Sequence, residues 1–342
     1  KPAAYAMSAR QHDPLTLNKL VNALLAQGIE VLRSPGGFAA PDGMTYPAGS
    51  FYVPLAQPKM GLVRYLLGET HYMDNEHTRR PDGTPIRPYD MGQDVLAEFM
   101  GIRADPLDEA VKAEFVKVTA PIARAGAVAP AAPFGYVIDG RLNDAFRAAN
   151  MLWDKGVALR RVTTAAGGLR PGDWIVPAGS GAPLADVARA TGVDFAPLKA
   201  AAGEGTHEAK RLRIGMYRRY RGGNMDEGWT RWLFEQWGFP FSEVYDAEIQ
   251  KGNLNATYDV FIFADDSTGM ITGEPGGGRG EGRGGQSFAS VPKTTPPEYR
   301  SGIGNEGVAA IRDFVQKGGT LVTLGGATDF AITRLGLPAR NA

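Results

Sequence analysis

The stretch from Arg211 to Val244 constrains the fold of this chain more than any other. It contains an alternating segment, a glycine-rich break, an amphipathic segment and a second apolar segment. Leu212, Ile214 and Met216 alternate with basic residues, which is the period-two pattern of a half-buried strand. After the break, Asn224 can cap a helix by accepting a backbone N–H. This order of strand, turn, helix and strand is how an open α/β layer begins.

The predicted helix of this stretch ends at Gly238, in the usual C-terminal position. Its large side chains recur at three- and four-residue spacing and therefore share one face. They are Trp229, Trp232, Leu233, Phe234 and Trp237. We expect this face to pack in the core or at a domain interface, in preference to serving as a carbohydrate platform.

Two carboxylates, Asp226 and Glu227, fall in the first turn of the same helix. The helix dipole favours negative charge there, and this structural role is the simpler interpretation. The alternative is a small-molecule site at the carboxyl edge of the sheet, where open α/β sheets bind ligands.

An internal repeat organises the first two thirds of the chain. In both halves a strand, a helix, a glycine and a second strand precede a Pro-Gly turn and a strand that ends in Val-Pro. PAGSFYVP at 47–54 corresponds to PGDWIVP at 171–177. We therefore predict two related α/β units, with a first unit at 1–119, a linker at 120–133 and a second unit at 134–203.

The last segment, 204–342, predicts a flavodoxin-like open parallel sheet. A near-continuous apolar run at 258–264 fits a buried parallel strand and is followed by Asp265 and Asp266. Together with Tyr217, Gly325 and Gly326, which stand near the ends of neighbouring strands, these residues form a candidate site for a small polar ligand.

The turn after the predicted strand at 320–324 has the position of a nucleophile elbow, which needs Ser or Cys. Here it reads Gly325-Gly326-Ala327-Thr328. Thr328 is the available hydroxyl, and we favour a helix N-cap role for it over a nucleophilic one.

Other chemistry is sparse. His71, Asp74 and His77 make the nearest approach to a metal cluster, but they lie in a turn-rich loop that imposes no common face. The segment from Arg87 to Asp90 contains a proline turn and is a candidate anion-binding site, although packing and capping are the simpler roles. The glycines at 280–285 match a dinucleotide fingerprint without a preceding strand or a following helix, so we interpret 275–286 as a flexible loop.

Composition excludes several classes of function. Lys+Arg and Asp+Glu are both 37, so no basic excess favours a nucleic-acid partner. No apolar run approaches the twenty residues of a membrane span. The chain has 0 cysteines, which removes thiolate nucleophiles and cysteine metal sites and suits an oxidising compartment. It begins at Lys1 without an initiator methionine, and we expect it to be a piece of a longer protein.

The chain resembles bacterial zinc carboxypeptidases of the carboxypeptidase A-like family. The resemblance is carried by the segments RIGMYRRY, NMDEGWTRWLFEQWGFPF, YDVFIFAD and GVAAIRDFVQKGGTLVTLGGATDFAI. The chain is similar to the region that follows the catalytic domain of these proteins. Its last segment resembles a class I glutamine amidotransferase-like domain. PAGSFYVPLAQP and RPYDMGQDVLAEFMG are similar to the connecting part.

This resemblance implies a secreted or periplasmic parent metallopeptidase that cleaves peptides with one zinc, held by an HxxE pair and a later histidine. None of these ligands has a counterpart here, so the expected role is non-catalytic: scaffolding, substrate positioning or oligomerisation. The implied partners are the upstream carboxypeptidase-like domain and a second copy of the chain. The alternatives are a stand-alone module that binds a small ligand, and a hydrolase that uses Thr328 or the group of His71, Asp74 and His77.

Overall fold

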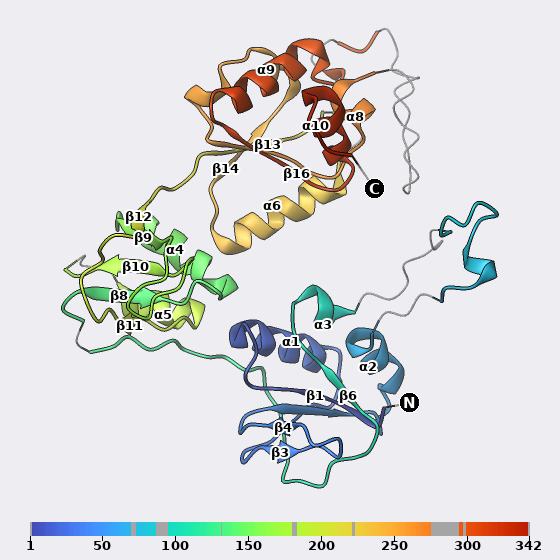
Figure 1. Ribbon diagram of the computed structural model, residues 1–342, viewed down its shortest axis with the longest axis vertical. Helices are drawn as coiled ribbons and strands as arrows, with labels where there is room; N and C mark the ends of the chain where they lie inside the picture. The colour runs from blue at the N-terminus through green and yellow to red at the C-terminus, as the bar shows by residue number, and fades with distance from the viewer. Residues whose placement is uncertain are drawn as a thin grey trace. The chain divides into compact units, whose positions relative to one another are not determined.

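The computed structural model describes two compact units, residues 1–209 and 210–342 (Figure 1). The described residues are 2–69, 73–86, 95–130, 132–179, 183–220, 223–274, 294–296 and 299–340. The class is α/β, as predicted. None of the helices in these ranges is long and apolar enough to cross a membrane.

The first unit begins with a five-stranded sheet in the order β6-β1-β5-β2-β7. Its strands are β1 (Ala4–Met7), β2 (Leu32–Arg33), β5 (Phe51–Pro54), β6 (Asp105–Leu107) and β7 (Val116–Lys117), and a separate hairpin comprises β3 (Phe38–Ala39) and β4 (Thr45–Tyr46). Its helices are α1 (Pro14–Ala26), α2 (Met60–Leu67), η1 (Glu76–Thr78) and α3 (Leu96–Phe99).

The second sheet of this unit has the order β11-β8-β10-β9-β12. Its strands are β8 (Gly135–Ile138), β9 (Leu159–Val162), β10 (Trp174–Pro177), β11 (Ala196–Pro197) and β12 (Thr206–Ala209), accompanied by α4 (Asn143–Asp154) and α5 (Leu184–Thr191). In both sheets the third strand of the predicted repeat lies antiparallel between the first two. The two flanking strands also correspond, so the repeat predicted from sequence is present in the topology.

The repeat extends to individual contacts. The Ser50 hydroxyl accepts the Ala9 N–H at 3.0 Å, and the Asp173 carboxylate accepts the N–H of Gly140 at 3.0 Å. In each sheet an arginine of the second strand also faces an aromatic residue of the third strand, Arg33 over Phe51 and Arg161 over Trp174. Equivalent side chains thus join the same strands in both sheets.

Helix α1 connects the two halves of the first unit. Asp13 caps it by accepting the N–H groups of Leu15 and Thr16, and its second carboxylate oxygen accepts the N–H of Asn143 at 2.8 Å. Lys19 forms an ion pair of 2.6 Å with Asp144 in the first turn of α4. The two repeats are therefore bonded to each other within one unit.

Strand β12 corrects a predicted boundary. The sequence placed residues 204–209 in the third domain, but β12 pairs along its length with β9 of the second sheet. The second unit starts at Lys210. The boundary was predicted too early because this exposed strand has no apolar face to mark it.

The second unit is a four-stranded parallel sheet in the order β14-β13-β15-β16, which is the flavodoxin-like arrangement. The strands are β13 (Ile214–Tyr217), β14 (Phe241–Val244), β15 (Val260–Phe263) and β16 (Thr320–Thr323). The helices are α6 (Met225–Trp237), α7 (Asp246–Gln250), η2 (Leu254–Ala256), α8 (Thr268–Thr272), α9 (Gly304–Gln316) and α10 (Ala327–Leu335).

Helices cover both faces of this sheet, with α6 on one side and α9 and α10 on the other (Figure 1). Along β15, Ile262 packs in the cluster that contains Phe234 of α6, whereas Phe261 and Phe263 pack with Phe314 of α9 and the core of the opposite face. All four residues of β13 are buried, so the predicted half-buried strand is a central strand buried on both faces.

Candidate functional site

The carboxyl ends of β13, β15 and β16 bring several predicted residues together. Asp265 and Asp266 follow β15, and Gly325 and Gly326 follow β16. Because the strands are parallel, these ends meet at one edge of the sheet, where such folds bind ligands. We call this set of residues, with Arg219 and Asn224, the carboxyl-edge cluster.

A buried ion pair lies at the centre of the carboxyl-edge cluster. Arg219 Nε is 2.6 Å from Asp266 Oδ2, and the two side chains are 12% and 10% exposed. The other oxygen of Asp266 accepts the Ser267 N–H at 3.0 Å. Burial raises the pKa of Asp266, and the charge of Arg219 acts in the opposite direction. Arg219 was missed at the sequence level, although a charged residue two positions beyond a predicted strand is a usable signal for this edge.

Asn224 joins helix α6 to this pair. Its Oδ1 accepts the N–H groups of Asp226 and Glu227, as predicted for an N-cap. Its Nδ2 donates to the carbonyl oxygen of Asp265 at 3.1 Å and lies 3.4 Å from Asp266 Oδ2. One amide side chain therefore fixes the start of α6 against the end of β15.

Asp265 is held by the turn after β16. Its Oδ1 accepts the Gly326 N–H at 2.6 Å. Gly325 adopts a positive φ of 50°, and a Cβ there would lie 2.4 Å from the Asp265 carboxyl carbon. The turn thus requires glycine both for its backbone conformation and for the close approach of the carboxylate.

Tyr217 points into the core and not toward a ligand. It is 5% exposed, and its hydroxyl donates to Asp246 Oδ1 at 2.7 Å. Burial, together with the neighbouring Asp246 carboxylate, raises the pKa of Tyr217 well above its ordinary value. Burial likewise raises the pKa of Asp246. We interpret this pair as a structural bond between β13 and α7.

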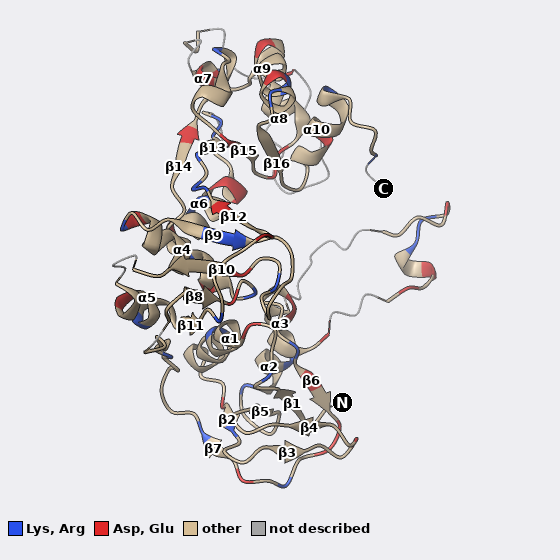
Figure 2. Cartoon of the chain, turned by 60° about the vertical axis from the view of Figure 1, so that its left-hand side comes forward, with Lys and Arg blue, Asp and Glu red and all other residues tan. Residues whose placement is uncertain are grey.

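The two carboxylates at the start of α6 differ in exposure. Asp226 is exposed, whereas Glu227 is 4% exposed, and both lie in the acidic first turn of α6 (Figure 2). Burial raises the pKa of Glu227, and Arg231 and Arg218 partly oppose this effect. Its nearest cation, Arg231 Nη1, is 3.9 Å away and forms its short contact with Glu243 instead.

The aromatic face of α6 lies largely outside the core, which was one of the two places predicted for it. Trp229 is 66% exposed and Trp232 is 50% exposed, with their rings 5.9 Å apart in an edge-to-face arrangement. Phe234 makes the contact with the sheet cluster, and Trp237 is half-buried. Of the two places predicted for this face, the core is therefore wrong for Trp229 and Trp232, because the helix is rotated so that Glu227 and Phe234 face inward. A domain interface stays a prediction.

Thr328 does not cap α10. The helix starts at Ala327 and its cap residue is Gly326, so Thr328 is inside the first turn and exposed. A nucleophile needs a base within about 2.6–3.2 Å. In the part of the chain that the structure describes, the Thr328 hydroxyl makes no hydrogen bond. The predicted N-cap role is thus replaced by an exposed position next to the glycine turn.

Several predicted residues lie outside the described ranges: His71, Arg87, Asp90 and the glycine-rich loop at 275–286. Of the proposed histidine group, Asp74 bonds to Arg79 through both carboxylate oxygens, and His77 is exposed beside Glu76. Within the described residues, no three His, Cys, Asp or Glu side chains are grouped to hold a metal ion.

The charged side chains of the carboxyl-edge cluster therefore bond to one another and to backbone N–H groups. This cluster ties α6, α8 and α10 to the sheet. Comparison with protein-family models, with curated proteins and with solved structures found no match to this chain.

Proposed function

We propose that this chain is a non-catalytic accessory region of a larger zinc carboxypeptidase-like metallopeptidase. Its role would be to scaffold the enzyme, to position its peptide substrate or to mediate assembly of copies. The observation that carries the non-catalytic part of the proposal is the internal pairing of the carboxyl-edge cluster. Asp266 is engaged by Arg219, and Asp265 by the Gly326 N–H.

Catalysis at this edge would require an activated nucleophile, a base and a free oxyanion donor. Here the carboxylates serve backbone and arginine donors, and the elbow turn carries Gly325 and Gly326 where a nucleophile would stand. Thr328 is exposed, and no base is bonded to it among the described residues. These features support a structural role for the edge and give no support to a hydrolase that uses Thr328.

The exposed aromatic face of α6 supports an interaction role. Trp229, Trp232 and Leu233 are all at least 45% exposed and lie on successive turns. Neighbouring exposed apolar side chains of this size are typical of protein–protein contact surfaces. We assign this face to contact with the upstream carboxypeptidase-like domain of the parent, which would hold the zinc in a periplasmic or secreted protein.

A peptidase assay on the whole parent protein tests the proposal. Hydrolysis of a peptide with a free C-terminus should be lost on zinc chelation and restored by added zinc, because the metal supplies the chemistry. Thr328→Ala should leave kcat within twofold of the unmodified protein. A large loss of kcat in Thr328→Ala, with the fold intact, would overturn the non-catalytic assignment.

A further inference from the structure

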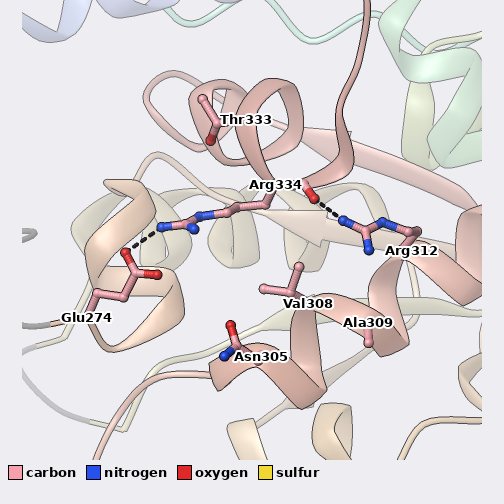
Figure 3. Close-up of a pocket in the computed structure, with 7 residues that line it drawn as sticks. All are labelled: Glu274, Asn305, Val308, Ala309, Arg312, Thr333 and Arg334. Atoms are coloured by element: carbon pink, nitrogen blue, oxygen red, sulfur yellow. Dashed lines mark hydrogen bonds and ion pairs between the residues drawn. The ribbon is translucent and has the colours of Figure 1, made fainter.

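A pocket of about 380 Å³ lies among α8, α9 and α10 of the second unit (Figure 3). It is at the C-terminal end of α10, whereas the carboxyl-edge cluster is at the N-terminal end of the same helix. Its volume falls in the range of small-molecule sites, which is about 300–1,000 Å³. The pocket is therefore separate from the candidate site described above.

Two guanidinium groups from different helices line this pocket. Arg334 extends from α10 and pairs with Glu274, and Arg312 reaches from α9 to donate to the Arg334 carbonyl oxygen (Figure 3). The side chains of Asn305 and Thr333 add an amide and a hydroxyl to the lining. Glu274 is the single carboxylate among the lining residues, so the lining carries a net charge of +1.

A structural role explains part of this arrangement. A cation near the end of a helix stabilises its last carbonyl groups, and Arg312 does this for α10. That role leaves two features without an explanation. The Nε of Arg334 is buried and has no hydrogen-bond partner in the described structure, and the hollow beside it is lined by the neutral amide of Asn305. A buried donor without a partner destabilises the fold unless a ligand or water occupies the site.

We propose that this pocket binds the oxyanion group of a small ligand, a carboxylate or a phosphate. The planar fork of arginine matches both groups through paired N–H donors. Asn305 supplies a further donor, whereas the Thr333 hydroxyl already donates to the Asp329 carbonyl oxygen at 2.6 Å. Val308 and Ala309 provide an apolar wall for the uncharged part of the ligand. Glu274 competes with the ligand for Arg334, because both need the same donors.

Calorimetric titration of the protein with inorganic phosphate, and separately with succinate, tests this site at constant ionic strength. We expect saturable binding of at least one probe, and the tighter of the two identifies the phosphate or the carboxylate as the preferred group. Arg312→Gln should weaken that binding at least tenfold. Glu274→Gln should strengthen it several-fold, because the competing carboxylate is removed.

Lys317→Gln is the matched control. Lys317 lies at the other end of α9 and pairs on the surface with Asp313, so this variant removes one positive charge without touching the pocket. Its affinity should equal that of the unmodified protein. Glu274→Gln also guards against misfolding as an explanation, since a folding defect does not raise affinity. The proposal is overturned if neither probe binds saturably, if Glu274→Gln does not strengthen binding, or if Lys317→Gln weakens binding as much as Arg312→Gln does.

Discussion

At the scale of single residues, the glycine turn after β16 determines whether the carboxyl-edge cluster can form. Alanine at Gly325 would have to adopt a positive φ and would place its Cβ against the Asp265 carboxylate. We expect Gly325→Ala to lower the free energy of unfolding by about 1–3 kcal/mol. Urea denaturation monitored by circular dichroism measures this change.

The control for that variant is a glycine in the same unit with the opposite expectation. Gly228 lies inside helix α6, and no atom approaches within 4 Å of a Cβ added there. Gly228→Ala should raise the free energy of unfolding by up to about 1 kcal/mol, because alanine favours the helix. If Gly325→Ala were as stable as the unmodified protein, the contact between Asp265 and the turn would be refuted.

Asp139 provides a pH-dependent test in the first unit. Burial raises its pKa, but hydrogen bonds and charge from Arg141 and Arg170 outweigh this, and its pKa falls to about 2 from an ordinary value of 3.8. An acid with a lowered folded-state pKa stabilises the fold above the unfolded pKa and loses that contribution as pH falls through the folded value. Asp139→Asn should therefore cost up to about 2 kcal/mol at pH 7 and less than about 0.5 kcal/mol at pH 2.

Unfolding by urea at pH 7, 4 and 2 measures this profile for Asp139→Asn. Asp186→Asn is the comparison, since Asp186 forms an exposed ion pair with Arg189 and such pairs contribute about 0–1 kcal/mol. A cost for Asp139→Asn that is the same at pH 7 and pH 2 would show that the arginine pairing does not set its pKa.

At the scale of elements, helix α6 shows what sequence periodicity resolves and what it leaves open. The spacing of apolar residues, the Asn224 cap and the Gly238 end gave a helix whose observed bounds are Met225–Trp237. The spacing did not determine which side chains face the sheet, and it left both the core and a domain interface open for the tryptophan residues. The structure turns Phe234 and Glu227 inward and leaves Trp232 half exposed.

Paired alanine substitutions in α6 test this rotation. Phe234 packs with Phe239 and Phe241 against the sheet, at ring distances of 5.2 and 6.0 Å. Phe234→Ala should lower the free energy of unfolding by roughly 2 kcal/mol, less than for a fully buried phenylalanine. Trp232→Ala should change it by less than about 0.5 kcal/mol in the chain of residues 1–342. The reverse order of effects, measured by urea unfolding, would mean that the tryptophan face is the buried one.

For the carboxyl-edge cluster, too, the sequence predicted the position of the residues but not all of their side-chain contacts. Asp265, Asp266 and the glycine turn were expected at this edge because parallel strands bring their carboxyl ends together. The partner of Asp266 was not expected, since Arg219 is far from it in the sequence and a single sequence carries no signal of side-chain pairing. Tyr217 was misjudged for a related reason, because strand position alone does not tell whether a side chain faces the core.

At the scale of the whole molecule, repeated phrases were the most informative part of the sequence. The correspondence of PAGSFYVP and PGDWIVP predicted two related units, and the two sheets share one strand order. The bonds that join these units through α1 and α4 could not be predicted from the sequence, because they depend on the packing of segments more than 100 residues apart. The exposed strand β12 was not predicted, because its sequence has no apolar pattern.

The parent protein itself gives the most direct test of the proposed function. Intact mass and zinc content should be measured together on protein purified from its native source. We expect a mass far above the 36.5 kDa of this chain and about one zinc per polypeptide, held by an open catalytic type of site. A mass near 36.5 kDa without zinc would contradict an accessory role in a zinc carboxypeptidase-like enzyme.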